Sequence, residues 1–244
     1  MGISLRMQDC IGYGSDGASV MVGQHNSVWT RIPAVAPDCI QVKCICHSLA
    51  LCVKYAFEKL PCSLGFLLAE VPKWFSKSTI RREAYKTLYN VMNPDDDERK
   101  APFQKYSTTR WLVRGKVTFH ILLDWDELKV YFMTVKCESN QDARYKARTI
   151  HGMLDDPINY LYFHFVSPLV TEFDRVNVFF QATDADPEEM HKELAAHGKS
   201  LRGRVFDRFG NRLPMQKVEF GGKFAFEVNK YVAAQPNSHR ASKG

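Results

Sequence analysis

One acidic turn and one cysteine–histidine pair are the residues of this chain whose types and spacing could do chemistry. Asp16 lies in the turn Gly14-Ser15-Asp16-Gly17-Ala18, directly after a short apolar run that predicts a buried strand. Ligands and metals bind at the carboxyl ends of the strands of α/β sheets. Cys44 and His47 stand where a second apolar run continues into a predicted helix.

Asp16 allows two interpretations. Mg²⁺ prefers hard oxygen ligands, and nucleases that use two metal ions hold them with several converging carboxylates. Asp16 could be one of those ligands if other acids complete the site. The alternative is that its carboxylate caps the helix that follows the strand, a role that needs no catalysis.

The pair Cys44 and His47 also allows two interpretations. Thiolates and imidazoles are zinc ligands, and Cys39, Cys46 and Cys52 are near in sequence. The spacing is not that of a zinc finger, because no second pair follows at a useful distance. The alternative is that Cys44 packs under the sheet and His47 opens the helix.

A third group of candidate residues begins at Arg110 and Trp111. An exposed tryptophan beside a cation can stack on an unpaired base while the cation contacts phosphate. Arg114 and Lys116 lie on neighbouring turns of the same predicted helix. The alternative is a tryptophan buried in a helix bundle. For Trp74 and Trp125 we expect only burial in the core.

The pattern of apolar residues predicts a helix-rich chain with two parallel strands. The strands are expected at 9–15 and 39–44, and a helix after Ala18 is expected to extend to Ile32. Further helices are expected at 45–60, twice within 62–92, at 108–123, 127–135, 138–150, 157–180, 184–197 and 201–209. Residues 210–244 are expected to be irregular, with a disordered tail after Pro236.

Three strings, "SDGASVMVGQHNSV", "KCICHSLAL" and "TTRWLVRG", resemble the hAT-type transposases and their domesticated, zinc-finger-associated relatives. They occur in the family's order with similar spacing. The resemblance covers residues 1–135 well and continues more loosely to about 205. It implies an α/β, helix-rich fold with a partial RNase H-like sheet in 1–60, a helical insertion in 61–209 and an unmatched segment in 210–244.

The resemblance also assigns roles to the candidate residues. Asp16 corresponds to the family's second catalytic aspartate, and Cys44 and His47 to an element that positions DNA near the active site. Arg110 and Trp111 correspond to the motif that contacts a DNA hairpin.

The family's other two catalytic acids have no counterpart here. Asp9 is not embedded in a strand-like run, and Glu188, Glu189 and Glu193 lie on a surface-like helix. One carboxylate cannot hold two metal ions, so we expect no bound cofactor, with Mg²⁺ binding only if other acids complete the site.

Two parallel strands need neighbours to satisfy their edge N–H and C=O groups. We therefore expect the chain to be a truncated copy of a longer transposase-derived protein. The predicted function is that of a catalytically inactive derivative that binds DNA or proteins, including copies of itself, in the nucleus by resemblance. The alternatives are a metal-dependent nuclease or transposase completed by a missing segment or a partner chain, and a purely structural interaction module.

Composition fits these expectations without deciding among them. The 244 residues carry a net charge of +6, which is compatible with a nucleic-acid partner. No run of about 18 apolar residues predicts a membrane span, and nothing at Met1 to Arg6 resembles a secretory signal. The seven cysteines are therefore expected to be reduced.

Overall fold

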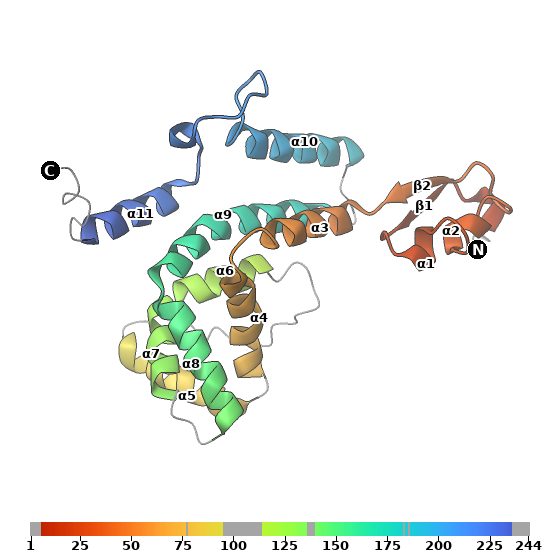
Figure 1. The fold of residues 1–244 in the computed structure, drawn as a ribbon. Helices are drawn as coiled ribbons and strands as arrows, with labels where there is room; N and C mark the ends of the chain where they lie inside the picture. The colour runs from red at the N-terminus through yellow and green to blue at the C-terminus, as the bar shows by residue number, and fades with distance from the viewer. Residues whose placement is uncertain are drawn as a thin grey trace.

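The computed structural model describes residues 6–76, 78–94, 114–135, 140–182, 184 and 186–235. The chain is a helix-rich α/β protein with a small parallel sheet near its N-terminus (Figure 1). Its elements are η1 Met7–Asp9, β1 Gly12–Ser15, α1 Ser19–Val22, α2 Val28–Arg31, β2 Ile40–Lys43, α3 Ile45–Phe57, α4 Cys62–Ser76, α5 Thr79–Met92, α6 Arg114–Leu123, α7 Trp125–Val135, α8 Gln141–Asp155, α9 Pro157–Phe179, α10 Pro187–Gly203, η3 Met215–Lys217 and α11 Gly222–Ala234.

The two predicted strands pair in parallel, with Gly12 opposite Ile40 and Gly14 opposite Val42. The expectation that the first strand is buried is wrong, because none of its four residues is buried, and the second strand is exposed throughout. Ile40 is 65% exposed and Val42 is 49% exposed. A Cβ atom added to either glycine would meet nothing within 4 Å. Parallel sheets are normally covered on both faces, so this face is bare among the residues that the structure describes.

The opposite face of the sheet has a small core of its own. Ile32, Ala36 and Cys39 are buried there, and Tyr13 and Trp29 pack against them. The two aromatic rings stack with their centroids 6.1 Å apart. The segment after α2, rather than a long helix, therefore closes this side of the sheet.

The single helix expected from Ala18 to Ile32 is wrong: α1 and α2 are separate four-residue helices. Ser27 prevents a continuous helix by capping the start of α2. Its Oγ accepts from the Thr30 N–H, and the Thr30 hydroxyl accepts from the Ser27 N–H. The same Oγ donates to the Gly23 carbonyl at 2.7 Å. Serine offers the backbone such local partners in place of helical ones.

The main core lies within α4 to α9. Trp74 and Trp125 are both buried in it, as predicted. The Ser78 side chain caps α5 by accepting from the N–H of Arg81. The expected break between α6 and α7 falls at Asp124, whose buried carboxylate accepts a hydrogen bond of 3.1 Å from the hydroxyl of Tyr85.

The 23-residue helix α9 connects most of the molecule. It packs against α3, α4, α6, α8, α10 and α11. A second core of Leu49, Val176 and Phe180 joins α3 to α9, with Cys46 and Met190 at its edge. Figure 1 shows that α3 leaves the sheet and lies along the end of α9. A shared core therefore links α3, in the segment 1–60, to α9, in the segment 61–209.

The C-terminal part differs from the prediction in two places. The helix expected at 201–209 is wrong: α10 continues to Gly203, and a tight turn with a bridge between Phe206 and Arg212 follows. The irregular segment expected from 210 contains α11. Phe220 and Phe224 pack on Phe165 of α9, and this tertiary contact is absent from the local pattern. The tail after Pro236 lies outside the described residues.

None of the helices in the described part of the chain is both long and apolar enough to cross a membrane.

Candidate functional site

The carboxyl ends of β1 and β2 bring the first two candidate motifs to one edge of the sheet. Asp16 follows β1 and Cys44 follows β2. The Cys44 N–H donates to the carbonyl of Ser15 at 3.0 Å, which extends the parallel pairing to the last residue before the acidic turn. The predicted placement of Asp16 at a strand's carboxyl end is therefore confirmed.

Asp16 is exposed and is held by its own turn. Its Oδ1 accepts from the Ala18 N–H at 3.2 Å, and Ala18 is the residue that precedes α1. The carboxylate thus fixes the entry into α1 although it does not occupy the N-cap position. Such a turn leaves the second oxygen, Oδ2, directed to solvent or to a ligand.

Within the described residues, no group of three or more histidine, cysteine, aspartate or glutamate side chains has the geometry to hold a metal ion. Glu188 and Glu189 lie in the exposed first turn of α10. Glu193 forms an ion pair with Arg175 of α9. These three glutamates therefore serve α10 and its contact with α9.

Cys44 and His47 lie at the start of α3. Cys44 is exposed at the N-cap position, so the expectation that it packs under the sheet is wrong. His47 lies in the first turn of the helix, as expected, and its side chain is half-buried. Cys46 turns the other way, toward α9, and burial raises the pKa of its thiol. The first turn of α3 therefore connects the carboxyl end of β2 to the core that α3 shares with α9.

The third candidate group is described only from Arg114 onward. Arg110 and Trp111 lie outside the described residues. Arg114 begins α6, and its guanidinium lies 5.4 Å from the ring centroid of Phe57, the last residue of α3. The guanidinium is half-buried, and desolvation lowers its pKa. The aromatic ring orients the guanidinium, and part of the guanidinium stays exposed to solvent.

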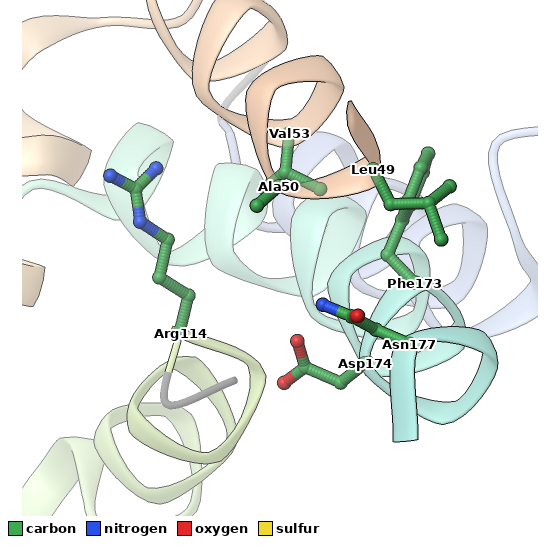
Figure 2. Close-up of a pocket in the computed structure, with 7 residues that line it drawn as sticks. All are labelled: Leu49, Ala50, Val53, Arg114, Phe173, Asp174 and Asn177. Atoms are coloured by element: carbon green, nitrogen blue, oxygen red, sulfur yellow. The ribbon is translucent and has the colours of Figure 1, made fainter. Parts of the chain in front are cut away.

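A small pocket lies where α3, the start of α6 and α9 meet (Figure 2). Its lining residues are Leu49, Ala50, Val53, Arg114, Phe173, Asp174 and Asn177. Its volume is about 10 Å³, which is space for roughly one water molecule. Figure 2 shows the Arg114 side chain extending away from the Asp174 carboxylate. The pocket is therefore a packed joint between three helices and not a small-molecule site.

Asp174 fastens the start of α6 to α9. Its Oδ2 accepts from the Gly115 N–H at 3.0 Å, one of the backbone donors left open at a helix N-terminus. Burial raises the pKa of Asp174 to about 6, against the opposing effects of this hydrogen bond and of Lys116. A carboxylate that titrates near neutral pH thus holds the helix that carries Arg114.

Gly115 is required by this contact. A Cβ atom at position 115 would lie 2.3 Å from the Asp174 carboxylate oxygen. Sequence reasoning missed both residues. The available signals were a glycine just inside a helix and a single aspartate in the apolar run of α9, and neither indicates its partner 59 positions away.

No protein-family model matches the chain, and no solved structure matches it.

Proposed function

We propose that this chain is a hAT transposase-derived protein that associates with DNA and does not cut it. One observation carries the proposal. The hydrogen bond from the Cys44 N–H to the Ser15 carbonyl puts the Asp16 turn and the Cys44–His47 segment at one edge of a parallel pair. That arrangement is the one expected for an RNase H-like sheet whose catalytic edge carries these motifs, and the finer fold assignment is part of the proposal.

The expected DNA contact includes the surface around α3 and the start of α6. Arg114 is oriented by Phe57, and Lys116 is exposed and follows Trp111 by five positions in the sequence. His47 and Cys44 open the helix that supplies Phe57. Cations on fixed backbones contact phosphates without reading sequence. This proposal places the protein in the nucleus.

The proposed lack of cleavage follows from the requirements of two-metal chemistry. Two Mg²⁺ ions need several carboxylates that converge on the reacting phosphate. Asp16 supplies one, and its Oδ1 accepts a hydrogen bond from the backbone N–H of Ala18. We therefore expect Asp16 to be a vestigial catalytic residue that shapes the turn.

DNA binding can be tested by fluorescence anisotropy with a labelled 20-base-pair duplex at several salt concentrations. The double substitution Arg114→Gln/Lys116→Gln should weaken binding roughly tenfold. It should also reduce the slope of log K against log salt by up to about 1.8, because each lost phosphate contact contributes about 0.9. The control, Lys86→Gln/Arg148→Gln, removes two exposed cations from α5 and α8.

If the control pair weakens binding as much as the α6 pair, the contact surface is not where we place it. An absence of duplex binding at 100 mM salt would favour the purely structural module instead.

Cleavage can be tested with a labelled hairpin DNA and with supercoiled plasmid, each in Mg²⁺ and in Mn²⁺. The proposal expects no product with the wild-type chain. Metal-dependent products that disappear with Asp16→Ala would overturn it and would establish the nuclease alternative, because Asp16→Ala removes the carboxylate that would bind the metal ion.

A further inference from the structure

Most of the chain's net charge lies in one short segment, residues 199–217, which covers the end of α10 and most of the connection to α11 and which we call the basic hairpin. It contains six cations and one carboxylate, a net charge of +5, whereas the whole chain carries +6. The cations are Lys199, Arg202, Arg204, Arg208, Arg212 and Lys217. A positive charge gathered over nineteen residues is a local feature and not a general property of the surface.

The turn of the basic hairpin is held by its own hydrogen bonds. Leu213 N–H donates to the Val205 carbonyl at 2.8 Å, and Asp207 N–H donates to the Asn211 carbonyl at 2.9 Å. The Asp207 carboxylate accepts from the N–H groups of Phe209 and Asn211, each at 2.8 Å. Because the only acid of the segment is bonded to the turn, its charge is directed inward, and the tip is formed by cations and rings.

Two arginines lie over the two phenylalanines of the hairpin. The Arg208 guanidinium is 4.6 Å from the ring centroid of Phe209, and that of Arg202 is 5.8 Å from the ring of Phe206. Arg202 also lies over the turn, because its guanidinium would be 3.1 Å from a Cβ atom on Gly210. Gly210 has φ of 85°, a left-handed conformation that glycine adopts without strain.

The rings of the basic hairpin are open to solvent. Phe209 at the tip is 73% exposed and Phe206 is 39% exposed. A ring this exposed contributes little buried apolar area to the fold. Arg208 and Arg212 on either side of the tip are exposed as well, and neither forms an ion pair within the described part of the chain.

We propose that the basic hairpin binds single-stranded nucleic acid, with an unpaired base stacked on Phe209 and phosphates on Arg202, Arg208 and Arg212. Single-strand binding surfaces combine a positive groove along the backbone with aromatic rings on which bases stack. A duplex would offer the cations its phosphates but would offer the ring no base face. This site is separate from the one around Arg114, and it remains even if the proposed function fails.

The test uses the full chain and fluorescence anisotropy with labelled dT20, a matched 20-base-pair duplex, and several salt concentrations. Phe209→Ala should weaken dT20 binding roughly 5- to 100-fold, the range for loss of one stacked base. Arg208→Ala/Arg212→Ala should weaken it roughly tenfold and reduce the slope of log K against log salt by about 1.4. The duplex should respond to the arginine pair and not to Phe209→Ala.

Two matched controls separate a local site from general effects. Phe226→Ala removes a ring of α11 that is 66% exposed, and Lys86→Ala/Arg148→Ala removes two exposed cations elsewhere. Both should leave dT20 binding within twofold of wild type. The proposal is overturned if either control matches its hairpin counterpart, or if wild-type chain does not bind dT20 at 50 mM salt.

A further arm uses vesicles of 3:1 phosphatidylcholine and phosphatidylserine, because an aromatic ring among cations also suits an anionic membrane surface. If Phe209→Ala weakens binding to vesicles but does not weaken binding to dT20, the ligand of the basic hairpin is a lipid surface and the proposal is overturned. Loss of dT20 binding in Phe209→Ala, together with duplex binding that stays intact and still depends on Arg114, would support it and would keep the two sites distinct.

Discussion

At the scale of single residues, the joint between α6 and α9 depends on a glycine and an aspartate that touch. Gly115→Ala should destabilise the protein by about 1 to 3 kcal/mol, because overpacking a closed contact forces a shift of backbone or side chain. The Asp174 oxygen that the new methyl group meets is held by the backbone N–H of Gly115 itself, so it has little room to move. Urea unfolding followed by circular dichroism measures the change.

The matched control for this glycine is Gly152→Ala in the last turn of α8. A Cβ atom there would meet nothing within 4 Å. Alanine has the better helix propensity, so this change should leave stability equal or raise it by up to about 1 kcal/mol. Equal destabilisation by both substitutions would contradict the importance of the α6–α9 contact.

The raised pKa of Asp174 also predicts how stability depends on pH. Its pKa of about 6 in the folded chain lies above the ordinary value, so folding favours the protonated form. The resulting stabilisation is complete below the unfolded pKa, near 4, and is lost as the pH rises through about 6. Asp174→Asn keeps an oxygen for the Gly115 N–H and removes the titration.

The asparagine variant should therefore gain stability relative to wild type as the pH increases from 4 to 7, by about 1 kcal/mol, since the group is only half-buried. Thermal unfolding of both chains at matched pH values measures the difference. A difference that is constant over this range would show that Asp174 does not titrate there.

At the scale of elements, α10 is docked on α9 over a buried histidine. His197 is 4% exposed and stacks edge-on against Phe173 with centroids 4.6 Å apart. Its Nδ1 is 3.7 Å from Glu172, too far for a hydrogen bond. Burial lowers the pKa of His197, more than the nearby glutamates raise it.

A histidine whose folded pKa is depressed contributes stability above its unfolded pKa of about 6.5, and this is lost as the pH falls toward the folded value. His197→Phe should therefore reduce the loss of stability between pH 7 and 5. His191→Phe on the exposed face of α10 is the control and should leave that loss unchanged. Hydrogen exchange of α10 amides at both pH values locates the effect, and equal behaviour of the two variants would contradict it.

The elements differ in how far the sequence predicts them, for physical reasons. The helices from 62 to 135 have regular apolar stripes, and Ser78 is a local cap, so their positions are visible in the pattern. The break into α1 and α2 depends on the hydrogen bonds of Ser27, which compete with a continuous helix. Helix α11 packs its phenylalanines on α9, and no local pattern predicts that contact.

The candidate site was predictable to a similar extent. The parallel strands place Asp16 and Cys44 at one edge, and this follows from strand order alone. The exposure of Cys44 and of both strands does not, because burial depends on what packs against an element. Asp174 and Gly115 are joined across 59 positions, and the basic hairpin lies in a segment that was expected to be partly helix and partly irregular.

At the scale of the whole molecule, the sheet and the helical body have separate cores. Among the described residues, the apolar side chains buried in the sheet unit are Ile32, Ala36 and Cys39, whereas the helical core is several times larger. In Figure 1 the sheet extends from the end of α3, away from the helices that enclose the main core. A two-stranded sheet with little apolar burial is only marginally stable in water.

Because regions with few buried contacts open without global unfolding, the amides of β1 and β2 should exchange at least roughly 30-fold faster than those of α4 and α9. Ile121→Ala removes a fully buried side chain from the main core. It should lower global stability by about 2 to 5 kcal/mol and leave the exchange of β1 and β2 unchanged, because their opening does not involve that core. Mass spectrometry of peptides from both regions measures this. If Ile121→Ala changes the exchange of β1 and β2 as much as that of α4 and α9, the sheet and the helical body unfold as one cooperative unit. The helical body would then stabilise the edge of the sheet that carries Asp16.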